Sequence, residues 1–576
     1  MYESQFEEKL YNERREKLRQ IGELGQKSGL SYAEATYPNH YAATITIPEL
    51  RAAYDPMTAE QFTADLEAGK KIEVAISGRI MAIRVQGKAG FAQLQQAGQR
   101  MQLYVRKDDV GEDGFALYKL LDLGDHVGAK GYLMRTRTGE LTVHVTNLTF
   151  LAKAMLALPD KFHGLEDTEL RYRQRYVDLF VNPDVREVFV KRAAILRAMR
   201  KFFDARGYLE VETPMMQAIA GGAAAKPFKT HHNALDLDLS LRIAPELYLK
   251  RLVGGGMDRV YEINRNFRNE GIDTSHNPEF TMLEFYQAYS NYHDLMDLTQ
   301  EMIAFVANEV NGTTITNFNG TEIDLGKWTK LSMRGAIKRF AKEELGVEIS
   351  DDAFNNDGSF RSFLKELHGV AKSWPDNNQD SWKSEAGRER ARRMRQIVNA
   401  IGGLVDETGD YLKLPGGLLT SGIYNPPGGF LLGKAIAETF ELLAEPHLIQ
   451  PTIIYDFPLA VSPLSKIKPG EPEWVERFEF YIGGFEVGNA FSELNDADDQ
   501  RRRFEAQIEE RKRGDEEAMA EVDEDYVRAL GYGLPPTAGE GVGIDRLTMV
   551  LTGSKSIRDV ILFPLLRPVG SKTAAE

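Results

Sequence analysis

The sequence predicts an α+β protein with two domains: a small N-terminal β-barrel and a larger domain with a mainly antiparallel sheet flanked by helices. Two observations support this fold class. Short β-rich runs are concentrated between residues 72 and 150, and beyond residue 183 long strand patterns are followed by clustered helices. With 576 residues, 42% hydrophobic and 27% charged, the chain has the length and composition of a folded protein of several domains.

The N-terminal segment, residues 1–65, is predicted to be a helical extension. Residues 1–30 are charged with a thin apolar stripe, as in a solvated surface helix. No apolar run is long enough for a secretory signal or a membrane helix, so we expect a cytoplasmic protein with no membrane partner. The chain has no cysteine, which excludes disulfides, cysteine-bound metals and thiol nucleophiles.

The next segment, residues 66–155, is predicted to form an OB-fold. A helix at 115–123 separates the third and fourth of five strand-like runs. These runs are residues 72–85, 91–95, 101–106, 126–135 and 141–150. Their order is typical of the OB-fold, which often binds single-stranded nucleic acid. Residues 71–153 contain 12 Lys and Arg against 8 Asp and Glu in a chain of net charge −15, and this local excess favours a nucleic-acid partner.

A linker is expected at 156–182, and residues 183–576 form the larger domain. This domain begins with a helix at 183–206, followed by an extended run that ends at Pro214. Residues of about 380–430 are predicted to be an insertion, because Pro and Gly clusters bracket a basic helix at 383–401. That helix is expected to be solvated, with an RNA contact as the alternative.

The first candidate cluster lies in residues 259–291, which predict two strands joined by a polar loop. Period-two alternation gives one face of the second strand an aromatic, a carboxylate and a phenol: Phe280, Met282, Glu284 and Tyr286. The polar segment supplies Arg268, Glu270 and His276, and an arginine fork suits phosphate or carboxylate. Surface ion pairing is the alternative interpretation of these three charged groups.

The second cluster lies in residues 477–493. A two-residue turn at Gly483 and Gly484 places Glu479 and Glu486 on one face, where two carboxylates suit Mg²⁺. Strict alternation turns Asn489 and Glu493 to the other face. We therefore expect a β-bulge near Gly488 if all four side chains share a site.

The third cluster is the segment from Gly539 to Arg546. Its three glycines at alternate positions are predicted to let a ligand approach the backbone closely, and Arg546 is expected in the first turn of the following helix. Glycines alone are weak evidence, but the three clusters together form one constellation.

These features resemble a known family. Pro214, the Arg268 and Glu270 loop, and the Arg546 segment resemble the three motifs of class II aminoacyl-tRNA synthetases. The runs APELYLKR, INRNFRNEG and GNAFSELNDA are similar to lysyl-tRNA synthetases in particular. The resemblance covers residues of about 60–375 and 430–570, and implies that 66–155 bind an anticodon and 183–576 form a class II catalytic domain. The sequence departs from it in the insertion and at Ala490, where glycine is more usual.

The resemblance implies a role for each matching residue. The catalytic residues are matched by Arg268 and Arg546. The ATP-binding residues are matched by Arg268, Glu270, His276, Phe280, Glu479 and Arg546. The lysine-binding residues are matched by Gly222, Glu246, Arg268, Glu284, Tyr286, Asn489 and Glu493. The Mg²⁺ ligands are matched by Glu479 and Glu486, and the anticodon-binding residues by Arg84, Phe91, Gln102 and Glu140.

The resemblance implies a lysine–tRNA ligase that forms lysyl-adenylate and pyrophosphate from L-lysine and ATP and then transfers lysyl to the terminal ribose of tRNA(Lys). It also implies bound Mg²⁺ and a homodimer. Two alternatives stay open: a paralogue that attaches lysine to a protein, and a non-catalytic tRNA-binding protein. Specificity for aspartate or asparagine needs cationic or amide groups where this chain has Glu493 and Tyr286. Phe91 could also belong to the barrel core.

Overall fold

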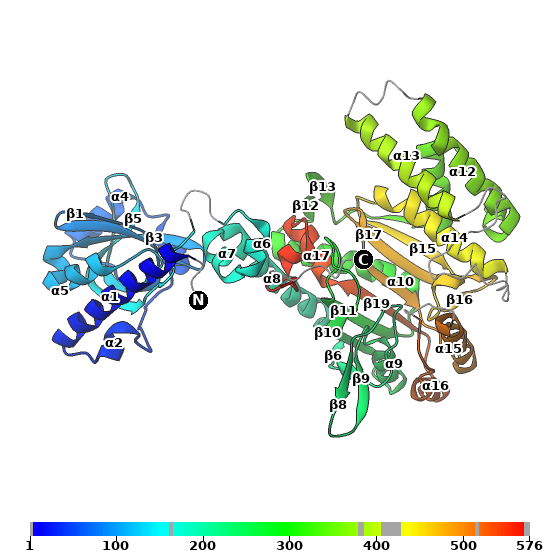
Figure 1. Cartoon of the computed structure of the whole chain (residues 1–576), viewed down its shortest axis with the longest axis horizontal. Coiled ribbons are helices and arrows are strands. Elements are labelled where there is room, and N and C mark those ends of the chain that lie inside the picture. The colour runs from blue at the N-terminus through cyan, green and yellow to red at the C-terminus, as the bar shows by residue number, and fades with distance from the viewer. Residues whose placement is uncertain (1–3, 160–164, 378–384, 405–427, 513–517, 569–576) are drawn as a thin grey trace. The chain divides into compact units, whose positions relative to one another are not determined.

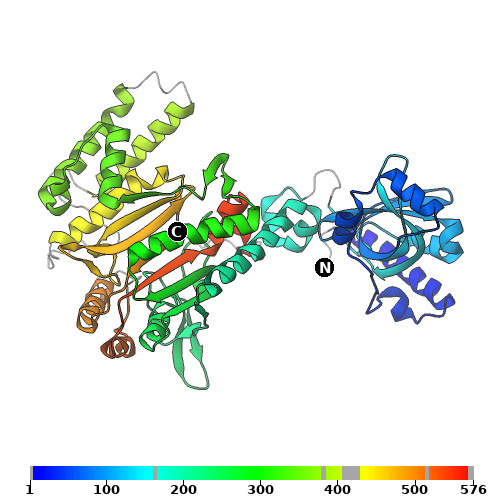
Figure 2. The same ribbon diagram turned by 180° about the vertical axis from the view of Figure 1, so that it is seen from behind.

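A computed structural model describes residues 4–159, 165–377, 385–404, 428–512 and 518–568 (Figures 1 and 2). The chain divides into two compact units, Met1–Arg186 and Glu187–Glu576. The first contains a closed five-stranded barrel and the second a large mixed sheet with helices, so the predicted α+β class is confirmed.

The barrel of the first unit has the strand order β1-β2-β3-β5-β4. Its strands are β1 (Glu73–Gln86), β2 (Ala89–Gln96), β3 (Gln99–Arg106), β4 (His126–Arg135) and β5 (Leu141–Ala152). They agree closely with the five predicted runs. The helix between β3 and β4, α5 (Lys107–Leu120), begins earlier than predicted, because Gly111 with φ 76° allows a kink between two short helical stretches.

The N-terminal extension packs on this barrel. Its helices are α1 (Gln5–Lys27), α2 (Tyr32–Thr36), α3 (Ile47–Tyr54) and α4 (Ala59–Glu67). Ile21, Ile47, Leu50 and Phe62 are buried in the same core as the barrel strands. The apolar stripe of α1 therefore faces the core, while most of its other side chains are exposed, as predicted for a charged surface helix with a thin apolar stripe. Two further short helices, α6 (Thr168–Arg173) and α7 (Arg175–Val181), lie in the predicted linker.

The second unit is built on a nine-stranded sheet of order β14-β15-β17-β18-β19-β11-β10-β6, with β16 paired to β17. Its strands are β6 (Leu209–Glu210), β10 (Arg259–Phe267), β11 (Glu279–Ala288), β14 (Thr329–Ser332), β15 (Thr452–Pro458), β16 (Ile467–Lys468), β17 (Glu471–Ile482), β18 (Phe485–Ser492) and β19 (Thr537–Gly543). Only the β6–β10 and β14–β15 pairs are parallel. The sheet is thus mainly antiparallel, as predicted. Smaller sheets comprise β12 (Ile315–Phe318) with β13 (Thr321–Asp324), and β7 (Met216–Gln217), β8 (Lys229–His232) and β9 (Leu237–Leu241).

Helices cover one face of this sheet. Strand residues on the other face line a cavity. The helices of the unit are α8 (Pro183–Asp204), α9 (Glu246–Gly254), α10 (Tyr292–Asn311), α11 (Met333–Leu345), α12 (Asp357–Asn377), α13 (Glu385–Leu404), α14 (Gly428–Leu443), α15 (Ala497–Lys512), α16 (Glu524–Gly531), α17 (Ile544–Thr552) and α18 (Ile557–Val560). Side chains of α8, α10 and α17 pack with alternate residues of the central strands, such as Phe285, Ala490 and Val542, in one apolar core.

The predicted insertion is only partly visible, since residues 378–384 and 405–427 lie outside the described residues. The predicted basic helix corresponds to α13. Its residues Ala391, Met394 and Ile397 are buried at helical spacing, so one side packs against the protein. The structure thus places part of this helix in a second apolar core formed with α11, α12 and α14. In the described ranges, no helix has both the length and the apolar character of a membrane span.

Candidate active site

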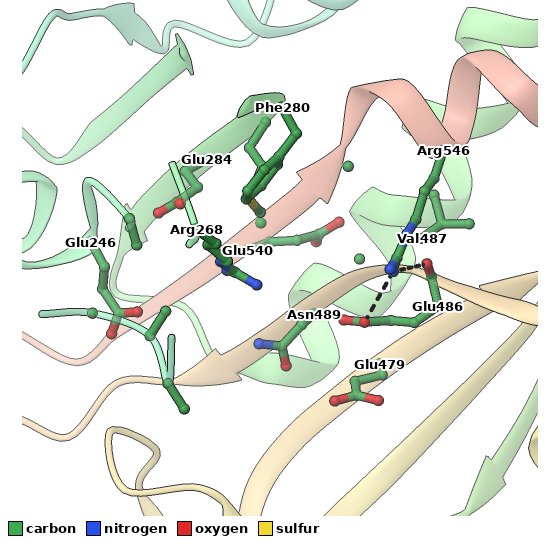
Figure 3. A pocket seen from close by; sticks show the side chains of 18 of the residues that line it. Glu246, Arg268, Phe280, Glu284, Glu479, Glu486, Val487, Asn489, Glu540 and Arg546 are labelled. Carbon is green, nitrogen blue, oxygen red and sulfur yellow. Dashed lines mark hydrogen bonds and ion pairs between the residues drawn. The ribbon is translucent and has the colours of Figure 1, made fainter. Parts of the chain in front are cut away.

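A cavity of about 460 Å³ opens on the free face of the large sheet (Figure 3). The strands β11, β17, β18 and β19 contribute to its lining, together with residues near the start of α9 and α17. Figure 3 shows Glu246 and Glu284 toward one end and Glu479, Glu486 and Arg546 toward the other. Three segments far apart in the sequence therefore meet in one cavity.

The floor of the cavity consists of two rows of directly opposed residues. The first row crosses four strands: Glu479, Asn489, Gly541 and Glu284. The second row is Arg477, Phe491, Gly539 and Tyr286. In each row the β19 position is a glycine, so the side chains of β18 and β11 flank a shallow trough. Neighbours in a row point to the same face because strand side chains alternate with period two.

The glycines of β19 are required by these neighbours. A Cβ atom on Gly539 would lie 2.2 Å from Cε1 of Tyr286, and one on Gly541 would lie 2.8 Å from Cε of Met282. Side chains of β11 thus lie close to these two glycines, which also line the cavity, and the close approach of a ligand to their backbone stays a prediction. At the end of the cavity near α9, Gly222 has φ 92°. A Cβ atom on Gly222 would lie 2.9 Å from the Cβ atom of Glu246.

The β-bulge expected near Gly488 is present at its neighbour, Val487. Tyr481 pairs with Glu486 as the predicted turn requires, but Phe480 pairs with Gly488, so one extra residue stands in β18. This shift puts Glu486 and Asn489 on the same cavity-facing side despite their odd spacing. Val487 and Ala490 instead enter the apolar core behind the sheet.

Two arginines line the cavity, Arg546 at one end and Arg268 between the two ends. Nη1 of Arg546 donates to the backbone oxygen of Glu486 over 2.7 Å and contacts its carboxylate at 3.3 Å. Nη2 donates to Nε2 of His276 over 3.1 Å. The guanidinium of Arg268 lies 5.1 Å from the ring centre of Phe280, within cation–π range. The buried Nε of Arg268 has no hydrogen-bond partner in the described part of the chain.

The carboxylate of Glu479 has two protein partners. Nη2 of Arg477 and the hydroxyl of Tyr481 each donate to it over 2.5 Å. Two further carboxyls lie near this end, Glu441 on α14 and Glu445 just beyond it. Burial, followed by the negative charges of neighbouring carboxylates that include Glu479 and Glu486, raises the pKa of each to about 7. Four acidic side chains thus lie near this end, with Arg477 and Arg546 as their cationic partners.

The other end of the cavity has buried carboxylates from three segments. Glu246 begins α9, Glu284 lies on β11 and Glu493 follows β18, and each is at most 6% exposed. Burial, followed by the charges of Glu246 and Glu262, raises the pKa of Glu284 to about 8. The hydroxyl of Tyr286 is 3.4 Å from Glu284. This end can compensate positively charged groups of a ligand.

All of the predicted site residues of the second unit gather at this cavity. Those that line it are Gly222, Glu246, Arg268, Glu270, His276, Phe280, Glu284, Tyr286, Glu479, Glu486, Asn489 and Arg546. Glu493 reaches the cavity floor with Oε1, which would lie 2.5 Å from a Cβ atom on the lining residue Gly539. The surface ion-pair interpretation does not account for this convergence.

The four residues expected to bind an anticodon lie on the barrel. Phe91 is 39% exposed on β2 and opposes Arg84 of β1. Its ring centre is 5.0 Å from that of Tyr104 on β3. Gln102, two residues from Tyr104, donates to Thr142 over 3.2 Å. Phe91 therefore lies on the outer surface, and the alternative that places it in the barrel core is wrong.

The fourth barrel residue, Glu140, precedes β5 and lies 3.8 Å from Arg51 of the N-terminal extension. Its side chain is 48% exposed. It is thus accessible, but an ion pair ties it to α3.

Comparisons with known proteins agree with this geometry. Residues 167–567 match the family of tRNA synthetases class II (D, K and N), and residues 74–151 match the OB-fold nucleic acid binding domain. The chain is 47% identical over 556 residues to a lysine–tRNA ligase of Moorella thermoacetica, covering 96% of this chain and 97% of that protein. The chain belongs to the class II lysine–tRNA ligase family. It is also 46% identical to the heat-inducible lysine–tRNA ligase of Escherichia coli K12, with 98% and 97% of the two chains covered.

Three residues that contact the cavity side chains were not predicted from the sequence. Arg477 donates to Glu479 and also to Asn489 over 2.9 Å, so it orients two cavity residues at once. Oδ2 of Asp273 accepts a hydrogen bond from Nδ1–H of His276 over 2.8 Å, which favours one tautomer of the imidazole. Lys250 contacts Glu246 and Glu493. Alternation along β17 could have identified Arg477, and helical i,i+4 spacing could have linked Lys250 to Glu246.

Proposed function

We propose that this chain is a lysine–tRNA ligase whose cavity activates L-lysine with ATP and passes lysyl to tRNA(Lys). The observation that carries the proposal is the set of buried carboxylates Glu246, Glu284 and Glu493 at one end of a cavity whose other end has Arg546 and acidic residues. Lysine brings two ammonium groups, and buried carboxylates require such partners. The nucleotide end needs cationic groups for phosphate.

The position of Arg268 supports a role at the junction of the two substrates. It lies between the two ends of the cavity in Figure 3, and its guanidinium is flanked by Phe280. An arginine there can hold the lysine carboxylate and the α-phosphate together. One carboxylate oxygen then attacks the α-phosphorus, the bond to pyrophosphate breaks, and lysyl-adenylate forms. Positioning and charge neutralisation suffice for this step, so no protein nucleophile is needed.

The nucleotide end also fits the other assigned roles. Arg546, held by Glu486 and His276, is placed to neutralise phosphate charge, and Phe280 offers a ring face for adenine. The fit to Mg²⁺ rests on Glu479 and Glu486, whose negative field contributes to the raised pKa values of Glu441 and Glu445. These two glutamates would hold the ion, which supplies charge neutralisation to the phosphates. Glu270 lines the same end.

The lysine end is assigned by chemistry. Glu246, beside the tight turn at Gly222, suits the α-amino group, while Glu493 with Tyr286 suits the ε-ammonium and Asn489 the carboxylate. A side chain without a terminal amine would leave Oε1 of Glu493 without a cationic partner, which costs on the order of 1–3 kcal/mol for a buried polar oxygen. Aspartate would bring a like charge to the same carboxylates. The pocket therefore favours lysine among the amino acids that this class of synthetases uses.

The second step uses the barrel. A hydroxyl of the terminal ribose of tRNA attacks the lysyl carbonyl carbon, and AMP leaves. The exposed Phe91 offers a stacking face for an anticodon base, with Arg84, Gln102 and Glu140 available to contact base edges. A ligase acting on a protein has no need of such a barrel.

Homodimer formation and a cytoplasmic location complete the proposal. The edge strand β6 carries Leu209, which is 52% exposed, and the adjoining surface includes Met257 at 42% and Tyr289 at 73%. Exposed apolar side chains at a sheet edge suit a second copy of the chain. Sedimentation equilibrium should give twice the mass of the chain, whereas a monomer at all micromolar concentrations contradicts the dimer.

The decisive experiment is ATP–pyrophosphate exchange with lysine, aspartate or asparagine as the sole amino acid. Exchange should depend on lysine, with the other two giving no more than background. Exchange driven by aspartate or asparagine contradicts the proposal, and exchange with none of them supports a non-catalytic tRNA-binding protein. Transfer of labelled lysine to tRNA, tested beside protein acceptors, then separates the ligase from its paralogues.

A further inference from the structure

The side chain of Lys250 lies wholly inside the protein between two carboxylates of the cavity. Its Nζ is 2.5 Å from Oε1 of Glu246 and also contacts Oε2 of Glu493, and the exposed fractions of the three side chains are 0%, 8% and 0%. Glu246 and Lys250 are one turn apart on α9, whereas Glu493 comes from the end of β18. One ammonium group thus joins two separate walls of the site.

A helix-stabilising role does not explain this arrangement. An i,i+4 pair on a helix surface contributes about 0.2–0.5 kcal/mol, and it needs neither burial nor a third partner. Removing an ammonium from water is costly unless carboxylates surround it. Burial alone would lower the pKa of Lys250, but Glu246 and Glu493 outweigh it and raise the pKa above its usual value. The group is therefore a permanent cation.

The pairing leaves the two oxygens of Glu493 unequal. Oε2 is the oxygen that contacts the ammonium of Lys250, while Oε1 lies at the cavity floor next to Gly539. Neither oxygen has a regular hydrogen-bond partner among the described residues. A single ammonium group is satisfied by one such oxygen. A guanidinium group binds carboxylates most strongly through two parallel hydrogen bonds, which need both oxygens.

Lys250 is also the cation that the two carboxylates Glu246 and Glu493 share. Without it, two buried carboxylates would lose a partner at once.

We infer that Lys250 is a positioning residue that holds Glu246 and Glu493 at a fixed spacing and, by occupying one oxygen of Glu493, makes the site prefer an ammonium to a guanidinium side chain. This inference rests on the proposed lysine-binding roles of Glu246 and Glu493. Lys250 touches neither substrate nor the reacting atoms in this scheme.

The test compares the wild-type full-length protein with Lys250→Met, which keeps side-chain length without charge. In ATP–pyrophosphate exchange, the KM for lysine should rise at least tenfold while the KM for ATP changes less than twofold. The preference for lysine over arginine, taken as the Ki of arginine divided by the KM of lysine, should fall at least tenfold. Arg251→Met is the matched control, since Arg251 follows on the same helix but pairs with Asp523 and Asp525. It should leave both quantities unchanged.

Lys250→Arg keeps a cation at the same position and should retain more of the preference than Lys250→Met, which separates the charge from mere packing. An unchanged KM for lysine in a folded Lys250→Met protein overturns the inference. So does a preference that is equally retained or equally lost in the Met and Arg variants. Failure of the wild-type protein to respond to lysine would instead overturn the proposed function itself.

Discussion

At the scale of single residues, the cavity depends on carboxylates that are kept away from water. Glu493→Gln should raise the KM for lysine at least tenfold and leave the KM for ATP nearly unchanged, because the amide removes the negative charge that pairs with the ε-ammonium. Steady-state exchange kinetics measure both constants. Unchanged lysine kinetics would remove Glu493 from the site.

A second residue, Glu540, makes stability depend on pH. It is buried behind the floor, where Oε2 accepts a hydrogen bond from Thr299 over 2.7 Å, and burial raises its pKa to about 8. The folded protein therefore keeps a proton that the unfolded chain releases near pH 4.5. The contribution of this group to stability is full below pH 4.5 and decreases as pH rises toward 8.

Replacing Glu540 by Gln removes this titration. The stability of Glu540→Gln relative to wild type should therefore increase from pH 4.5 to pH 8, by on the order of 3–5 kcal/mol. Urea unfolding at several pH values measures the difference. Glu322→Gln, at an exposed position on β13, is the control. A difference that is independent of pH would show that Glu540 is ionised in the folded protein.

The sequence predicted many of the cavity residues, but it did not predict the buried side chains that contact them. Motif spacing and the resemblance identified Arg268, Glu284 and Glu493, because each belongs to a local pattern. Lys250 was missed as a partner of the cavity carboxylates, since its contact with Glu493 joins positions 243 apart in the chain that only the folded protein brings together. Sequence patterns contain little information on such non-local pairs.

At the scale of secondary-structure elements, the trough along β19 requires glycine. Gly539→Ala should destabilise the protein by about 1–3 kcal/mol and raise the KM for lysine, because the new methyl group would overlap Tyr286 and Glu493. Gly369→Ala is a matched control: a Cβ on Gly369, inside α12, meets nothing within 4 Å. It should be neutral or stabilise by up to about 1 kcal/mol. Denaturant unfolding and lysine kinetics distinguish the two variants.

The barrel strands permit a separate test of the RNA-binding proposal. Phe91→Ala should lower kcat/KM for tRNA by about 5- to 150-fold, corresponding to about 1–3 kcal/mol of base stacking, and leave lysine-dependent exchange unchanged. Phe6→Ala, which removes another exposed phenylalanine of the same unit, should have no effect on either. Normal aminoacylation by Phe91→Ala would contradict a stacking role.

Elements were predicted well where hydrophobic periodicity is strong. The five barrel strands, α8, β10 and β11 all lie close to their expected ranges. One difference has a local cause, since Gly111 allows α5 to begin before the predicted apolar stretch. The buried Ile21 shows that α1 uses its thin stripe to cover the barrel. The bulge at Val487 was expected only because chemistry demanded it, since alternation alone gives a regular strand.

At the scale of the whole molecule, the two compact units divide the proposed work. Phe91 lies in the first unit and Glu493 in the second, and each unit has an apolar core of its own. The double variant Phe91→Ala with Glu493→Gln should therefore lose kcat/KM for aminoacylation by the product of the two single losses, to within about 0.5 kcal/mol. Measurement uses tRNA charging at subsaturating lysine and tRNA. A strongly non-additive result would show that anticodon binding and lysine binding are coupled.

The class of the whole fold followed from the order of elements along the chain, whereas strand order in the large sheet did not. β11 lies beside β19 although about 250 residues separate them. Such a neighbour relation is fixed by packing of α10 and α17 behind the sheet, through residues such as Met302 and Leu547, which a local pattern cannot reveal.

The extra residue at Val487 makes the site sensitive to the parity of one strand. Every cavity-facing position after it, from Asn489 to Glu493, keeps its orientation only while the number of residues between that position and the turn does not change by one. Deleting Val487 would reverse the face to which each side chain of this run points. The carboxylate of Glu493 would then face the apolar core, and Ala490 would face the cavity. Substitutions can thus adjust this enzyme gradually, but a length change of one residue between Phe485 and Glu493 cannot.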